Sequence, residues 1–245
     1  MQENVVENNE RELSETLDKF LAKPVVKNMK TLQALKYGYM DIVQHNESQD
    51  NTFFSQYFDV FAKNPYPQVY DTYHEIQGLK RTQKKVMNNP NFKNAMKFII
   101  DCDRSIHKVF EREFKKIGVR YNGDFLQGIQ DELGALVLKL KRHYNRPRPY
   151  QFAYYGKQNF HPFNTTSGHS PAYPSGHSCQ AHFLMEVMAF RVPTKARQLK
   201  QLGQRIADTR IDMGVHYPSD NKFGKEIALT LKKIPEVRER YFNKR

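Results

Sequence analysis

Hydrophobic residues recur along most of this chain with the spacing of an amphipathic helix. The clearest case is Phe125–Tyr144, where apolar residues spaced three and four apart lie on one helical face. Residues 91–117 repeat the pattern, and no long run alternates apolar and polar residues as a strand would. We therefore predict an all-α fold, with helices near 8–22, 29–46, 52–63, 66–87, 91–117, 124–145, 176–190, 194–213 and 218–232.

The main irregular stretch is 146–174, which contains five prolines and two glycines. A loop this long inside a compact domain is often functional. We expect a compact helical bundle with an active site at helix ends, beside this long Pro-rich loop. Residues 1–64 are predicted to form an N-terminal helical extension packed on the core, and 65–245 the main helical domain with its motifs in 139–220.

Composition and charge narrow the classes of partner. The 245 residues can bury a substantial core, and the net charge of +13 attracts nucleic acid, acidic membranes or phosphorylated substrates without choosing among them. The first twenty residues are acidic and polar, unlike a signal peptide. No apolar run approaches the roughly 18–20 residues of a membrane span. We expect a soluble, cytoplasmic protein, and the sequence allows an oligomer.

A first chemical segment places cations at the end of the 124–145 helix and just beyond it. Lys141 and Arg148-Pro149 have the spacing Lys-x6-Arg-Pro, and Lys139 with Arg146-Pro147 has the same spacing. These residues could bind an anion. They could equally complement the helix dipole, with the prolines simply ending the helix.

A second segment, Pro174-Ser175-Gly176-His177, stands directly before a helical pattern. A helix N-terminus binds anions through its free N–H groups, and a glycine lets the backbone approach closely. Ser175 offers a hydroxyl and His177 can donate a proton, although Ser175 could be only an N-cap. Ser-Gly-His also occurs at 167–169, but no helix follows that copy, so we favour the later one.

A third segment joins Arg210, His216 and Asp220 with the spacing Arg-x5-His-x3-Asp. Pro218 suits the first turn of a helix, which puts His216 just before that helix and Asp220 within its first turn. A carboxylate there can accept from one imidazole nitrogen and leave the other free. Alternatively, Asp220 is only a favourable acid at a helix start and His216 a packed residue.

In this order, the three motifs resemble the type 2 phosphatidic acid phosphatase superfamily, which includes class A bacterial acid phosphatases, membrane lipid phosphatases and vanadium haloperoxidases. The resemblance covers roughly 124–225 and is closest to the soluble acid phosphatases. It favours Lys141 with Arg148, because an aromatic residue follows Pro149. Thr209 stands where the superfamily usually has serine before the arginine, and it keeps the hydroxyl.

The resemblance implies a metal-independent phosphomonoester hydrolase that forms a phosphohistidine on His216. His177 would be the acid and base, and Asp220 would orient the nucleophile. The expected substrate is a small phosphorylated molecule, with no cofactor or metal and with vanadate as an inhibitor. The residues expected to bind phosphate are Lys141, Arg148, Ser175, Gly176 and Arg210.

Two other functions fit parts of the sequence. A basic nucleic-acid-binding protein with an unused anion pocket agrees with the charge, although no nucleic-acid-binding motif supports it. A vanadium-dependent haloperoxidase would use the same pocket, because vanadate mimics a pentacoordinate phosphate.

Overall fold

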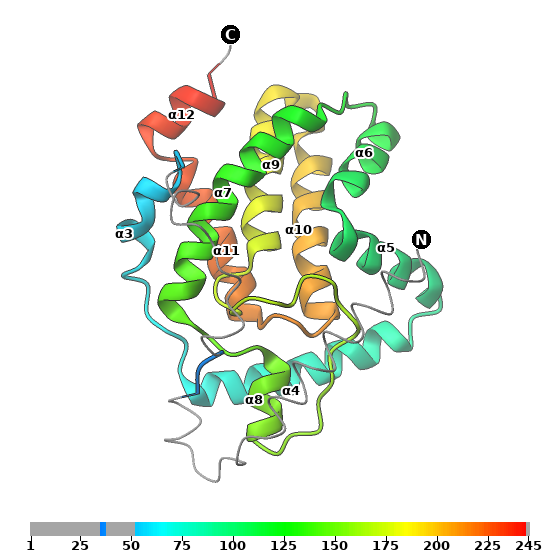
Figure 1. The fold of residues 1–245 in the computed structure, drawn as a ribbon. Helices are drawn as coiled ribbons and strands as arrows, with labels where there is room; N and C mark the ends of the chain where they lie inside the picture. Colours follow the sequence, from blue (N-terminus) through cyan, green and yellow to red (C-terminus); the bar gives the residue numbers. More distant parts are fainter. Residues whose placement is uncertain (1–34, 38–51, 244–245) are drawn as a thin grey trace, which may run out of the picture.

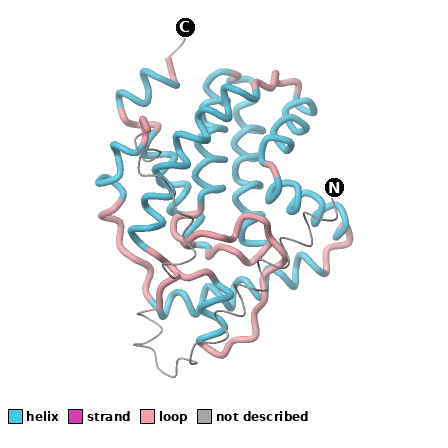
Figure 2. Tube along the Cα trace, in the orientation of Figure 1, coloured by secondary structure: helices cyan, strands magenta, loops and turns pink. Residues whose placement is uncertain are grey.

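The computed structural model describes residues 35–37 and 52–243. Within these residues all regular structure is helical, which confirms the predicted all-α class (Figure 2). The 3-10 turns are η2 (Ser55–Tyr57) and η3 (Pro193–Lys195). The α-helices are α3 (Phe58–Phe61), α4 (Val69–Met87), α5 (Phe92–Arg104), α6 (Ile106–Ile117), α7 (Gly123–Tyr144), α8 (Pro149–Tyr155), α9 (Gly176–Arg191), α10 (Ala196–Asp212), α11 (Pro218–Leu231) and α12 (Pro235–Tyr241).

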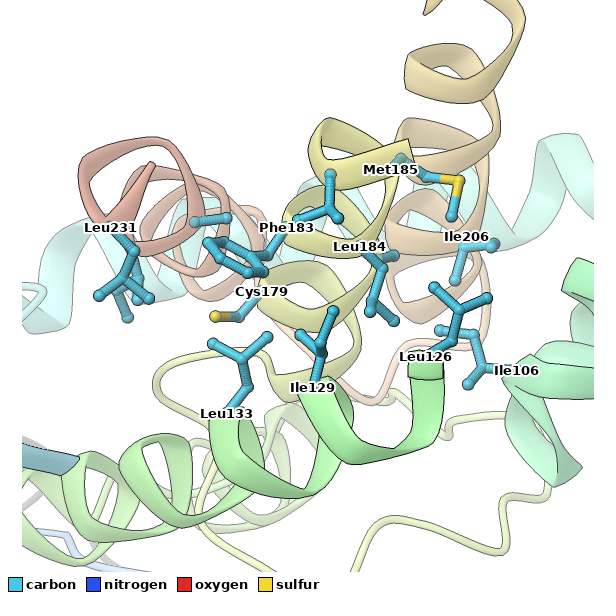
Figure 3. Close-up of a cluster of buried hydrophobic side chains, with 14 of the residues drawn as sticks. Ile106, Leu126, Ile129, Leu133, Cys179, Phe183, Leu184, Met185, Ile206 and Leu231 are labelled. Atoms are coloured by element: carbon cyan, nitrogen blue, oxygen red, sulfur yellow. The ribbon is translucent and has the colours of Figure 1, made fainter. Parts of the chain in front are cut away.

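Helix α9 is the centre of the bundle, and every residue from 181 to 189 is buried. It packs against α7, α10 and α11, which stand around it in Figure 1. The core between them is apolar, and burying each such large side chain contributes about 1.5–3 kcal/mol. Figure 3 shows part of this core, including Leu133 of α7, Cys179 and Leu184 of α9, Ile206 of α10 and Leu231 of α11.

One end of the bundle is covered by α4, α8 and the loop between α8 and α9, as the lower part of Figure 1 shows. The ends of the central helices meet here. Ser175, which caps α9, donates its backbone N–H to the carbonyl of Asp220 in α11 (3.0 Å). The chain leaving α7 joins them, because the carbonyl of Arg146 accepts from the N–H of Ala172 (2.8 Å).

Beyond the N-terminal region, the helices differ from the prediction in three places. The expected helix at 91–117 is broken at Ser105, whose backbone is extended and whose hydroxyl caps α6 by accepting from the N–H of Lys108. The apolar spacing continues across the break and hides it. Helix α8 lies inside the stretch predicted as a loop, where Pro149 occupies the first helical position, which proline tolerates. Helix α12 was also not predicted.

The N-terminal predictions fall largely outside the described residues. The helix at 8–22 lies there entirely, and so does most of 29–46. Residues 35–37 are described and are not helical, so a continuous helix over 29–46 is wrong. Tyr37 is instead buried, and its N–H donates to the carbonyl of Asn145 (3.1 Å). The 52–63 helix is reduced to η2 and α3, and the division at residue 64 stays a prediction.

None of the helices in the described ranges is long and apolar enough to cross a bilayer.

The contact between α11 and α9 gives a stability prediction. A Cβ at Gly224 would lie 2.6 Å from the carbonyl oxygen of Ser175 and 3.0 Å from the backbone N of Cys179. No side-chain rotation can relieve a clash with backbone, so Gly224→Ala should lower the free energy of unfolding by about 2 kcal/mol or more. The matched control is Gly128→Ala in α7, where a Cβ meets nothing within 4 Å.

Gly128→Ala should raise stability by about 0.5–1 kcal/mol, because alanine is the better helix former. Urea denaturation of both variants measures the difference. Equal stability would contradict the close approach of the two helices.

Candidate active site

His216 lies on the turn between α10 and α11, and that turn is tightly packed. Gly214 has a left-handed backbone (φ 76°). A Cβ there would lie 2.6 Å from the ring of Phe160 and 2.7 Å from Nε2 of Gln83. Gln83 of α4 also donates to the carbonyl of Met213 (3.3 Å). Only glycine fits this position, and the packing fixes the direction in which the chain presents His216.

Asp220 sets the state of the His216 ring. It is the third residue of α11, and its Oδ2 accepts from the backbone N–H of Tyr217 (2.8 Å), as an acid at this position commonly does. The same oxygen lies 3.0 Å from Nδ1 of His216. A carboxylate can only accept, so the imidazole proton resides on Nδ1. This leaves the lone pair on Nε2.

The His216 imidazole is held neutral. Burial and the charges of Arg148, Lys141 and Arg210 keep its pKa well below the usual value. Its Nε2 lies 2.9 Å from Nη1 of Arg148, which therefore donates to the lone pair. A neutral imidazole with one nitrogen bonded to a carboxylate and the other unprotonated can act as a nucleophile.

Three predicted cations surround this ring from separate helix ends, and all are buried. Lys141 is in the last turn of α7, Arg148 directly precedes α8, and Arg210 is in the last turn of α10. Their exposed fractions are 4%, 1% and 0%. Burial and the neighbouring charge of Arg148 lower the pKa of Lys141 well below its usual value. Several positive charges in so dry a site favour a bound anion.

The loop at 167–171 supplies an oxygen acceptor to each cation. All three acceptors are hydroxyl or carbonyl oxygens, so the oxygens of a tetrahedral anion could replace them. This loop contains the earlier Ser-Gly-His copy, whose part in the site was not predicted. The pairs are Arg210 Nη2 to Ser167 Oγ (2.8 Å), Arg148 Nε to the carbonyl of Ser170 (2.7 Å), and the Lys141 ammonium to the carbonyl of Pro171.

Asp103 of α5 is a buried partner that sequence reasoning missed. Its Oδ1 accepts from Nη1 of Arg210 (2.7 Å) and from Oγ of Ser167 (2.6 Å). Arg210 Nε is buried and has no hydrogen-bond partner among the described residues. Asp103 belongs to no motif. The one sequence signal is a carboxylate four residues after Ile99, on the apolar face of the helix.

The start of α9 is the second predicted anion contact. Ser175 is the N-cap, and its Oγ accepts from the N–H of Ser178 (3.3 Å). Accepting this bond leaves the hydroxyl proton available to donate. The first N–H groups of the helix have no intrahelical acceptor and can bind an anion. A Cβ at Gly176 would lie 3.4 Å from Val137, an ordinary contact, so packing alone does not require glycine there.

His177 lies in the first turn of α9 and is half-buried. Within the described part of the chain, its ring makes no hydrogen bond. Burial and the charge of Arg210 lower the pKa of His177 to about 3, with Lys141 and Arg148 acting in the same direction. The ring is therefore neutral near neutral pH. A bound anion would oppose the cations and raise that pKa.

The structure distinguishes the two lysine–arginine pairs that share the Lys-x6-Arg-Pro spacing. Lys139 lies 4.8 Å from the ring centre of Phe58. Arg146 donates to Oδ1 of Asp220 (2.6 Å) and thus lies behind the carboxylate rather than against the imidazole. Lys141 and Arg148 are the pair whose charges act on His216. In the described ranges, no group of three His, Cys, Asp or Glu side chains could hold a metal ion.

Part of the chain is similar in sequence to known proteins. The PAP2 superfamily model matches residues 132–231, a segment that contains every predicted site residue but neither Asp103 nor α4. The lipid A 1-phosphatase of Rhizobium johnstonii is 37% identical over 89 residues, which cover 36% of this chain and 35% of that protein. The lipid A 1-phosphatase of Rhizobium etli is 36% identical over 89 residues, covering 36% and 37%. The match spans about a third of these relatives' length.

The Asp103–Arg210 pair gives a pH-dependent stability prediction. Burial alone would raise the pKa of Asp103, but the charge of Arg210 and the hydrogen bonds from Ser167 and Thr166 outweigh it and hold the pKa well below its usual value. The stabilisation is therefore present above the unfolded pKa of about 4 and is lost as the pH falls toward the folded value. Asp103→Asn should cost about 3–5 kcal/mol at pH 7, because it leaves a buried arginine unpaired.

Thermal unfolding between about pH 3 and pH 7 checks this prediction, because the difference between wild type and Asp103→Asn should shrink as the solution becomes acidic. The exposed Asp124→Asn, in the first turn of α7, is the matched control. A stability difference that did not change with pH would contradict the buried ion pair.

Proposed function

Residues 132–231 of the chain match the PAP2 superfamily model, and on that premise we propose that the protein is a metal-independent phosphomonoester hydrolase. The reaction passes through a phosphohistidine on His216. The observation that carries this proposal is a neutral imidazole, bonded to Asp220, among three buried cations. Such a site joins a nucleophile to fixed positive charge, which is what transfer of a phosphoryl group requires.

The phosphate of the substrate binds between Lys141, Arg148 and Arg210. Its oxygens take the place of the loop acceptors at 167–171 on these cations. The guanidinium groups give paired, planar hydrogen bonds that a lysine cannot. The Ser175 hydroxyl and the Gly176 N–H donate at the start of α9. Because the fold holds these donors around one point before the chemical step, they stabilise the charge of the transition state once the phosphate oxygens have replaced the loop acceptors.

His216 Nε2 attacks phosphorus as the bond from phosphorus to the leaving oxygen breaks. Asp220 stabilises the positive charge that develops on the ring through the Nδ1 proton. The negative phosphate raises the pKa of His177, which then gives its proton to the leaving oxygen. In the second step a water attacks the phosphohistidine and His177 takes a proton from that water. The phosphorus–nitrogen bond breaks, phosphate leaves, and His216 is neutral again.

Two classes of substrate are candidates for this site. We favour a small phosphomonoester met in the cytoplasm, the substrate class of the soluble acid phosphatases that the motifs resemble. The names of the relatives favour a second candidate, a phosphate carried on a lipid. A net charge of +13 suits either, because both substrates are anionic.

Hydrolysis of p-nitrophenyl phosphate tests the mechanism. Wild-type activity should survive EDTA and be blocked by vanadate, because side chains rather than a metal hold the phosphate. His216→Ala should lose at least about a thousandfold in kcat, since the nucleophile is removed. The control is His74→Ala, an exposed histidine on α4. Loss of activity in EDTA would reject the metal-free route, and an active His216→Ala would reject the phosphohistidine.

The choice between these two substrate classes is tested by comparing kcat/KM for small phosphomonoesters with kcat/KM for phosphatidate in detergent micelles. We expect the small esters to be the better substrates, and the reverse result would assign the site to lipid phosphates. Two further assays address the other functions. Bromide oxidation by peroxide with added vanadate would indicate a haloperoxidase, and salt-dependent DNA binding without hydrolysis would indicate a nucleic-acid-binding protein.

A further inference from the structure

Arg146 is among the most deeply buried of the described side chains, although it is not one of the three cations around the His216 ring. Its guanidinium lies between two carboxylates. Nη1 donates to Oδ1 of Asp220 (2.6 Å), and Nη2 donates to Oε2 of Glu75 (3.0 Å). Asp220 thus has one oxygen on His216 and the other on Arg146. A guanidinium in this position can determine both the charge and the angle of the carboxylate.

Glu75 belongs to α4, outside the segment that matches the superfamily model. Besides Arg146, it holds the first turn of α11. Its Oε1 accepts from the backbone N–H of Ser219 (2.6 Å) and its Oε2 from the Ser219 hydroxyl (2.9 Å). The residue next to Asp220 is therefore tied to α4 as well, and Glu75 joins the covering helix to the nucleophile turn.

The plane of the Arg146 guanidinium is also fixed from the sides. Its central carbon lies 3.9 Å from the ring centre of Tyr217, and the ring of Tyr173 is 5.8 Å away. Nη2 makes a further bond to Oγ1 of Thr72 (2.9 Å). These contacts leave Arg146 one orientation, and in that orientation it is directed at Asp220.

We propose that Arg146 and Glu75 are positioning residues for Asp220. Arg146 keeps this carboxylate ionised, and Glu75 holds Arg146 and the first turn of α11 so that the carboxylate stays turned toward His216. The imidazole then retains its proton on Nδ1 and its lone pair on Nε2. This inference rests on the proposed function, because it names what prepares the nucleophile. Neither residue touches the phosphate. They act through Asp220 alone.

The physical reason is the burial of Asp220. A carboxylate with no exposed surface tends to become neutral unless a cation faces it. Burial raises the pKa of Asp220 to about 6, and the charge of Arg146 opposes that rise. Without Arg146 the carboxyl would be protonated at higher pH and would hold the Nδ1 proton weakly. The imidazole could then place its proton on Nε2, where attack on phosphorus is blocked.

Other charges also face Asp220, and they set the sign expected for Glu75. Lys141 on α7 lowers the pKa of Asp220, whereas Glu75 on α4 raises it; His216 is neutral. Glu75→Gln removes a like charge, so it should lower the pKa of Asp220 while loosening Arg146. Arg146→Met should raise that pKa. The two variants are expected to move the acid limb of the pH profile in opposite directions.

The experiment measures kcat and KM for p-nitrophenyl phosphate from about pH 4.5 to 8.5 in wild type, Arg146→Met, Arg146→Lys and Glu75→Gln. Arg146→Met should lose about a hundredfold in kcat with KM within about threefold, and its acid limb in kcat/KM should move up by about one pH unit. Compared with Arg146→Met, Arg146→Lys should return the acid limb to its wild-type position but recover only part of kcat. Lysine keeps the positive charge but lacks the two parallel N–H donors of the guanidinium. Glu75→Gln should move the limb downward.

The matched comparison is Arg148→Lys, which alters a proposed phosphate contact and should raise KM instead. The substrate's own titration is common to all variants, so any displacement of the limb belongs to the enzyme. A rise in KM on Arg146→Lys with an unmoved limb would make Arg146 a substrate ligand and overturn the proposal. An unmoved limb in Glu75→Gln would overturn it too, and this variant suffices if Arg146→Met does not fold.

A readout independent of activity separates this inference from the proposed function. Nitrogen-15 NMR of labelled histidine reports which ring nitrogen of His216 carries the proton. Wild type should show the proton on Nδ1 and Arg146→Met a mixture of both forms, whereas Arg146→Lys, which keeps the charge, should retain the wild-type form. An unchanged wild-type pattern in Arg146→Met would overturn the positioning role. If wild type hydrolyses no phosphomonoester yet these shifts appear, the function fails and the positioning stands.

Discussion

The structure depends on one buried carboxylate, Asp220. Its two oxygens join the His216 imidazole to the Arg146 guanidinium, and its backbone carbonyl accepts from Ser175 at the start of α9. A buried charge is costly unless its partners are in place. The position of α11 is therefore coupled to the exit of α7, to the N-terminus of α9 and, through Glu75, to α4. A change in any of these contacts would therefore alter the position of His216.

The balance of buried charge explains why this end of the bundle suits an anion. Four cations, Lys141, Arg146, Arg148 and Arg210, are buried at it. Arg146 and Arg210 each have a carboxylate within 3 Å, but the bonds of Lys141 and Arg148 described above go to neutral oxygens and a ring nitrogen. The site thus has uncompensated positive charge in a dry setting, where a dianion gains most. The fold bears the cost of assembling these charges in advance, which is what makes such a site effective.

The contacts around the anion site come from parts of the chain that lie far apart in sequence. The loop at 167–171 covers the cations, and Asp103 of α5 holds that loop through Ser167 while it pairs with Arg210. Asp103 therefore couples the position of a cation to the position of the loop. Tyr37, near the other end of the chain, donates from its hydroxyl to the carbonyl of Gly168 (3.4 Å) and adds a further contact to the same loop.

The pattern of residues close together in the sequence was enough to predict the helices with strong apolar spacing and the residues at their ends. Lys141, Ser175 and Asp220 stand within a turn of a helix terminus, where caps, prolines and charges follow short-range rules. Asp103, Glu75 and the loop at 167–171 could not be found this way. Asp103 lies 107 residues from its partner Arg210 in the chain, and Glu75 lies 71 residues from Arg146. Ser167 of the loop lies 43 residues from Arg210. Such contacts exist only once the helices have packed, because packing rather than spacing brings their side chains together.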